Sequence, residues 1–164
     1  MRFAIVLGFF ATCTSVCFGQ GPRSFDTVTL ERTSCFGACP AYTVVIKSSG
    51  TVRFNGKSDV AAKGEKQGKV TVSDLEFLGT AIKRADFYQL RDSYAKTSDG
   101  CKEVWTDNPS LVIKVTSGTN TKSVTYYFGC RGPLVLSTIS WLADTIDEIA
   151  GTSQWVGAQL LKDN

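Results

Sequence analysis

The strongest constraint on the fold is a stretch in which apolar and polar residues alternate on both sides of a short turn. Residues 111–116 alternate in this way, residues 117–120 (Ser-Gly-Thr-Asn) favour a turn, and residues 124–128 resume the alternation. A period of two is typical of a strand with one buried face. Two such runs joined by a turn predict a β-hairpin.

The N-terminal half predicts further strands. Residues 28–33 and 42–47 are rich in β-branched side chains, and residues 51–54 follow a Ser-Ser-Gly turn at 48–50. The polar, lysine-rich stretch 56–68 is expected to form a loop with one short edge strand. These strands add a second hairpin to the expected sheet.

Two amphipathic helices are also expected. Ser73 and Glu76 have the spacing of a capping box, which predicts a helix that ends near Asp86. Pro133 is suited to the first turn of the second helix, and Gly151 to its left-handed C-terminal cap. The apolar residues of both helices recur at spacings of three and four, as in helices that bury one face.

The order of strands, helix, β-hairpin and helix predicts the α+β fold class. We expect an antiparallel sheet built from strands and hairpins, with two helices packed on one face. A chain of 164 residues suits one domain. Residues 91–109 are expected to form a long polar loop.

The N-terminus has the pattern of a secretory signal peptide. Arg2 precedes an almost wholly apolar run at 3–10, and Cys17-Phe18-Gly19 ends the stretch. The run is too short to cross a bilayer, and no later segment of the mature chain predicts a membrane span. We therefore expect a periplasmic or secreted protein. Its expected parts are a signal peptide at 1–19, a flexible leader at 20–26, a single disulfide-stapled α+β domain at 27–156 and a C-terminal tail at 157–164.

The charge of the chain is weak. It has 18 basic and 15 acidic residues, and removal of Arg2 with the signal peptide leaves 17 against 15, a net charge of +2. So small a charge, scattered along the chain, does not indicate binding to nucleic acid.

The cysteines predict cross-links. The chain has six cysteines, and cleavage after residue 19 leaves four. An even number in an oxidising compartment predicts a disulfide framework. Of the three possible pairings we favour Cys35–Cys39, which closes a tight loop around Gly37, together with Cys101–Cys130, which joins the ends of the hairpin region.

The residue types present argue against the commonest catalytic sites. The chain has no histidine, which removes the usual general base and the usual partner of a serine or cysteine nucleophile. No glycine-rich phosphate loop follows a predicted strand. We therefore expect no catalytic residues, no metal and no cofactor.

Two hypotheses of function follow. The first is a non-catalytic binding or interaction module that contacts a partner protein or a component of the cell envelope through its loops. Its candidate interaction patch is Trp105, Asp107 and Tyr127. The second is a thiol redox or copper-handling protein that uses Cys35 and Cys39, because two thiolates can bind copper(I). The Cys-x-x-x-Cys-Pro spacing is similar to that of thioredoxin-fold copper-delivery proteins.

Several motifs together resemble a known family. The most specific is Cys35-Phe36-Gly37-x-Cys39-Pro40-x-Tyr42. The supporting motifs are Gly50-Thr51-Val52, Ala85-Asp86-Phe87 with Leu90 and Tyr94 beyond it, Thr106-Asp107-x-Pro109, Gly129-Cys130 before Gly132-Pro133, and Ile146-Asp147 with Thr152 and Trp155. Over roughly residues 27–156 the chain resembles a bacterial family of exported proteins described as domain of unknown function 6438. The resemblance implies no activity, substrate or cofactor.

Overall fold

A seven-stranded sheet, in the order β4-β3-β2-β1-β7-β8-β5, forms the centre of the structure. The computed structural model describes residues 24–157, so the expected signal peptide and the tail from residue 158 lie outside the described residues. The strands of this sheet are β1 (Thr27–Arg32), β2 (Ala41–Lys47), β3 (Thr51–Ser58), β4 (Gly64–Lys69), β5 (Ser93–Tyr94), β7 (Ser110–Ser117) and β8 (Asn120–Tyr127). A separate pair consists of β6 (Glu103–Val104) and β9 (Cys130–Arg131).

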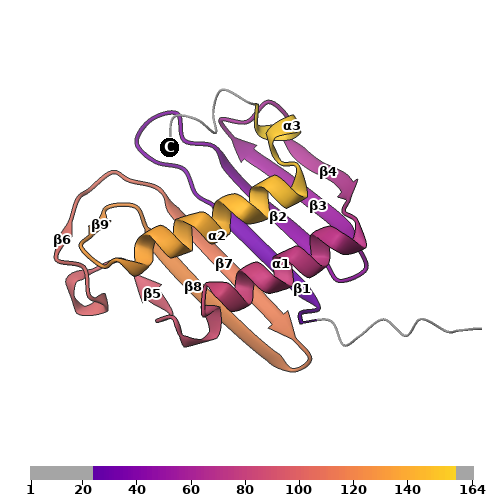
Figure 1. Cartoon of the computed structure of the whole chain (residues 1–164). Coiled ribbons are helices and arrows are strands. Elements are labelled where there is room, and N and C mark those ends of the chain that lie inside the picture. The colour runs from indigo at the N-terminus through magenta and orange to yellow at the C-terminus, as the bar shows by residue number, and fades with distance from the viewer. Residues whose placement is uncertain (1–23, 158–164) are drawn as a thin grey trace, which may run out of the picture.

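Two helices cover the same face of the sheet (Figure 1). They are α1 (Val72–Arg84) and α2 (Val135–Ala150), and a short helix, α3 (Ser153–Val156), follows α2. Alternate strand residues such as Leu30 and Ile113 are fully buried, as are Leu78 of α1 and Ile146 of α2. The predicted α+β fold class, with both helices on one face of a largely antiparallel sheet, is confirmed.

One strand departs from the antiparallel pattern. Ser93 and Tyr94 of β5 pair in parallel with Thr125 and Tyr126 of β8. Strand β5 lies within residues 91–109, which were expected to form a long polar loop. The side chain of Tyr94 is buried against the core. A strand of two residues has no periodicity, so the alternation that predicts longer strands could not indicate it.

The first helix begins two residues earlier than expected. The capping box uses Thr71 and Asp74: the Thr71 hydroxyl accepts from the Asp74 amide, and Asp74 accepts from the Thr71 amide. The prediction of Ser73 and Glu76 was wrong. The amide of Val70 still donates to the carbonyl of Gly50. Sheet pairing therefore ends at Val70, and the helix starts directly after Thr71.

The last residues of the expected leader pack onto the domain. Phe25 is buried, the Asp26 amide donates to the Thr116 carbonyl at 2.7 Å, and the Asp26 carboxylate accepts from the Gly118 amide at 2.6 Å. At the other end, Gly151 caps α2 in the left-handed conformation, as predicted, and the ring centres of Trp155 and Phe54 lie 5.1 Å apart.

Within the described residues, none of the helices is both long and apolar enough to cross a bilayer.

Candidate functional site

The connection between β1 and β2 presents an exposed aromatic side chain. This segment, residues 33–40, is called the β1–β2 loop below. A disulfide between Cys35 and Cys39 closes its centre, and Gly37 between them has a φ of +149°, which a residue with a side chain rarely adopts. Phe36 is 91% exposed. A phenylalanine so exposed on a cross-linked loop contributes little to the core, so packing does not explain it.

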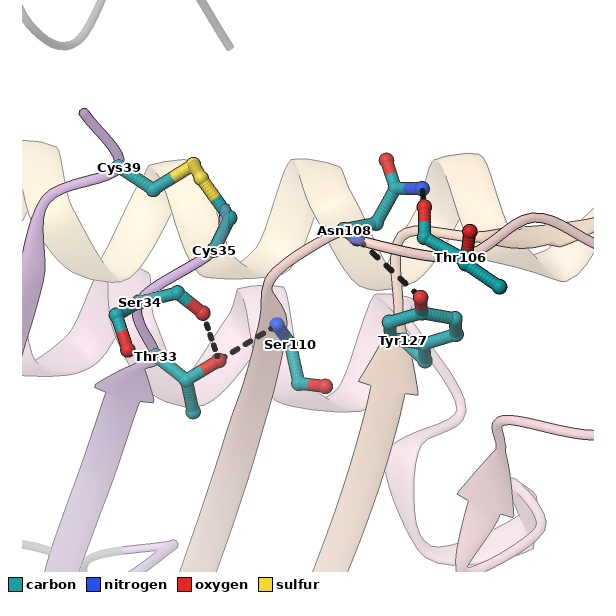
Figure 2. Close-up of a disulfide and its surroundings, with 8 residues drawn as sticks. All are labelled: Thr33, Ser34, Cys35, Cys39, Thr106, Asn108, Ser110 and Tyr127. Atoms are coloured by element: carbon teal, nitrogen blue, oxygen red, sulfur yellow. Dashed lines mark hydrogen bonds between the residues drawn. A yellow bond between two sulfur atoms is a disulfide. The ribbon is translucent and has the colours of Figure 1, made fainter. Parts of the chain in front are cut away.

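The neighbouring strand β7 holds the start of this loop. The Thr33 amide donates to the Ser110 carbonyl at 2.9 Å, and the Ser110 amide donates to the Thr33 hydroxyl at 2.7 Å. Figure 2 shows this contact below the Cys35–Cys39 disulfide. The two bonds extend the β1–β7 pairing by one residue, so the loop leaves the sheet in a fixed direction.

A buried carboxylate from α2 holds both ends of the loop. Arg32 and Tyr42 are paired neighbours on β1 and β2, just before and just after the loop. The Tyr42 hydroxyl donates to Asp147 at 2.8 Å, and the Arg32 guanidinium donates to it at 2.9 Å. The Thr152 hydroxyl donates to it at 2.9 Å. Arg32 also forms an ion pair with Asp144 on the outer surface of α2, at 2.8 Å.

The electrostatics of this cluster follow from its burial. Burial raises the pKa of the Asp147 carboxyl group, against the opposing effects of the Arg32 guanidinium and the Tyr42 hydroxyl. Burial also raises the pKa of the Tyr42 hydroxyl, and the nearby Asp147 carboxylate raises it further. Burial lowers the pKa of Arg32, but the Asp147 carboxylate, the Tyr42 hydroxyl and the Asp144 carboxylate together more than offset this and raise the pKa above its usual range. The arginine therefore stays charged and requires Asp147 as its counter-charge.

A second loop, residues 105–109 between β6 and β7, lies at the same end of the sheet, next to the β1–β2 loop (Figure 2). Its backbone is fixed where the Trp105 amide donates to the Gly129 carbonyl at 2.9 Å. A Cβ atom at Gly129 would lie 2.0 Å from the Trp105 carbonyl oxygen, so only glycine permits this approach. Trp105 is 55% exposed, and the Arg131 guanidinium lies 4.5 Å from the centre of its indole ring.

The second disulfide, Cys101–Cys130, anchors this loop to the domain. Both cysteines are buried, and Cys130 pairs with Val104 in the small β6–β9 sheet. The Lys102 amide donates to the Arg131 carbonyl at 2.8 Å. The two disulfides join the pairs that the sequence favours.

The three residues of the predicted interaction patch have different surroundings. Trp105 and Asp107 are exposed, and Asp107 has a left-handed backbone with a φ of +65°. Tyr127 is half-buried, and its hydroxyl accepts from the Asn108 amide at 3.2 Å, which braces the loop from below (Figure 2).

The sequence did not indicate the Arg32–Asp147 pair or single out the exposed Phe36. One signal for Asp147 was available: it lies four residues after Ala143 and three before Ala150, on a helix face that is otherwise apolar. A carboxylate on such a face requires a buried partner. Nothing in the sequence says that the partner is Arg32, 115 residues away.

The surroundings of Cys35 and Cys39 differ from those of redox motifs. Such motifs commonly place the reactive cysteine at a helix N-terminus, which lowers the thiol pKa. The β1–β2 loop instead joins two strands. Among residues 24–157, no group of three or more histidine, cysteine, aspartate or glutamate side chains lies close enough together to hold a metal ion.

Comparison with known proteins gives a family without a described activity. The family model described as a domain of unknown function, DUF6438, matches residues 26–150. This range includes the β1–β2 loop, both disulfides and Asp147. No curated protein matches the sequence.

Proposed function

Because the chain belongs to the DUF6438 family of domains of unknown function, its role has to be inferred from its surface, and we propose that it is an exported, non-catalytic module that binds a partner protein through Phe36. The observation that carries the proposal is the 91% exposure of this side chain at the tip of the disulfide-closed β1–β2 loop. Trp105 and Asp107 on the adjacent loop extend the contact surface, and Tyr127 supports it.

The constraints on this loop support the proposal. Association costs conformational entropy when a flexible segment becomes ordered, and a segment that is already fixed avoids most of that cost. The β1–β2 loop is fixed by a disulfide, by Ser110 and by the Asp147 cluster. Aromatic anchors that fill a pocket of the partner commonly contribute much of the binding energy at protein interfaces.

Export is part of the proposal. Two disulfides suit an oxidising compartment outside the cytoplasm, and the apolar N-terminal run has the pattern of a cleaved signal peptide. In that compartment the partner would be another exported protein or the external part of a membrane protein.

Site-specific photo-crosslinking tests the proposal. We expect a photoreactive phenylalanine analogue at position 36, introduced into the full chain in its own cells, to give one protein adduct of defined mass. Position 77 is the matched control, because Phe77 is an aromatic side chain of α1 that is 56% exposed. Mass spectrometry of the same material is expected to show a mature chain that begins at Gln20.

Competition by added protein measures how much Phe36 contributes to binding the partner. Excess wild-type protein should suppress the adduct, whereas Phe36→Ser should compete roughly tenfold to a hundredfold less well, because burial of one phenylalanine contributes about 1.5–3 kcal/mol. Phe77→Ser should compete like the wild type. The proposal would be wrong if both positions gave the same adducts, if position 36 gave none, or if Phe36→Ser competed fully.

A further inference from the structure

A cleft lies between the end of one helix and the start of the other. Its volume is about 300 Å³, and its lining residues are Arg84 in the last turn of α1 and Ser137, Thr138 and Trp141 in the first half of α2. None of these residues belongs to the surface proposed to bind a partner protein. The volume is at the lower end of the range of about 300–1,000 Å³ that is typical of small-molecule sites.

Arg84 provides a positioned positive charge in this cleft. Its guanidinium carbon lies 5.3 Å from the centre of the Trp141 ring, which is within the range of a cation–π contact. The ion pairs of the described residues involve other side chains, so within residues 24–157 no carboxylate neutralises Arg84. A guanidinium group carries five N–H donors in a planar arrangement that matches two oxygens of a carboxylate or phosphate group.

The rest of the lining is polar or aromatic and carries no acid. Thr138 supplies a hydroxyl group, whereas the Ser137 hydroxyl already donates to the Leu134 carbonyl at 2.8 Å and adds no donor for an anion. Arg84 is the one charged side chain of this lining, and the first turn of α2 contains no acidic residue. An anion in the cleft would therefore meet the Arg84 guanidinium and the Thr138 hydroxyl without a repelling carboxylate in the lining.

From this arrangement we infer that the cleft binds the anionic group of a small molecule, a carboxylate or a phosphate. The guanidinium of Arg84 forms a paired hydrogen bond with two of its oxygens, and the Thr138 hydroxyl donates to the same group. The indole of Trp141 holds the guanidinium in place and offers an apolar surface to the body of the ligand. This site is independent of the contact surface at Phe36.

Nuclear magnetic resonance of the mature protein tests the inference. The indole N–H signal of Trp141 and the side-chain N–H signal of Arg84 are followed during separate titrations with sodium phosphate and sodium acetate, at constant pH and ionic strength. We expect both signals to shift saturably with at least one of the two anions. Saturation with phosphate alone assigns a phosphate group, and saturation with acetate alone assigns a carboxylate.

Two variants distinguish binding in the cleft from a non-specific effect of the added anion on exposed positive charges. Arg84→Gln should weaken the apparent affinity roughly tenfold or more, because it removes the charge-assisted hydrogen bonds. Lys83→Gln, an exposed cation in the same helical turn, should retain the saturable shift. The inference is overturned if neither anion gives a saturable shift, or if the shift persists with unchanged affinity in Arg84→Gln.

Discussion

Replacement of Arg32 by methionine is expected to lower the free energy of unfolding by about 3–5 kcal/mol at neutral pH. The substitution keeps the length and much of the volume of the side chain but removes the positive charge beside Asp147. The Asp147 carboxylate then remains buried with only the Tyr42 and Thr152 hydroxyls as donors. A buried charge without its counter-charge is among the few defects that cost this much. Urea unfolding of the variant and the wild type measures the difference.

The matched control is Asp144→Asn. Asp144 binds the same guanidinium as Asp147, but its side chain is 72% exposed, so water screens the pair. We expect this variant to lose less than about 1 kcal/mol. Equal losses for Arg32→Met and Asp144→Asn would show that burial of the Asp147 pair is not what matters.

The decrease in the free energy of unfolding caused by Arg32→Met should also depend on pH. Burial raises the folded-state pKa of Asp147, and removal of Arg32 takes away the largest effect that opposes it. An acid whose pKa is raised on folding contributes stability below its unfolded pKa of about 3.9, and this contribution is lost as the pH rises through the folded value. The deficit of Arg32→Met should therefore be smaller near pH 4 than at pH 7. A deficit that does not change with pH would contradict this explanation.

Removal of the Cys101–Cys130 disulfide is expected to lower the free energy of unfolding by about 3.5 kcal/mol. The bridge closes a loop of 29 residues in sequence separation, and in the chain-entropy model this restricts the unfolded chain far more than a short loop does. The measurement is urea unfolding of the doubly substituted Cys101→Ala, Cys130→Ala protein under non-reducing conditions.

The short bridge provides the comparison. Cys35 and Cys39 are only four residues apart, so Cys35→Ala with Cys39→Ala should cost about 2 kcal/mol. This variant should keep the fold but loosen the β1–β2 loop, and we expect it to reduce the yield of the adduct formed at position 36. If loss of the short bridge lowered the free energy of unfolding more than loss of the long one, the chain-entropy explanation of the two bridges would be wrong.

The parts of the fold that repeat along the sequence could be predicted. The hairpin of β7 and β8 was clear because buried residues alternate with more exposed ones over residues 110–116 of β7 and residues 123–127 of β8. The second helix was clear because its buried residues recur at helical spacing and Gly151 ends it. Such local signals need no knowledge of distant parts of the chain.

The parts of the fold that depend on contacts between distant residues could not be predicted from the sequence. The choice of Thr71 over Ser73 as the helix cap depends on how far the sheet extends, through the bond from Val70 to Gly50. The parallel pairing of Tyr94 with Tyr126 joins residues from separate regions and leaves no local pattern. The same is true of the site: a tight disulfide around Gly37 could be inferred, but the exposure of Phe36 depends on which face the loop presents.

The central claim is that the β1–β2 loop holds Phe36 in a fixed, exposed position before any partner arrives. The most direct measurement is ¹⁵N relaxation of the backbone amides of residues 34–39 in the free mature protein. A loop that is already fixed should give order parameters of about 0.85, like those of the rigid backbone in the flanking strands. Values below about 0.6 would show a flexible loop and contradict the central claim.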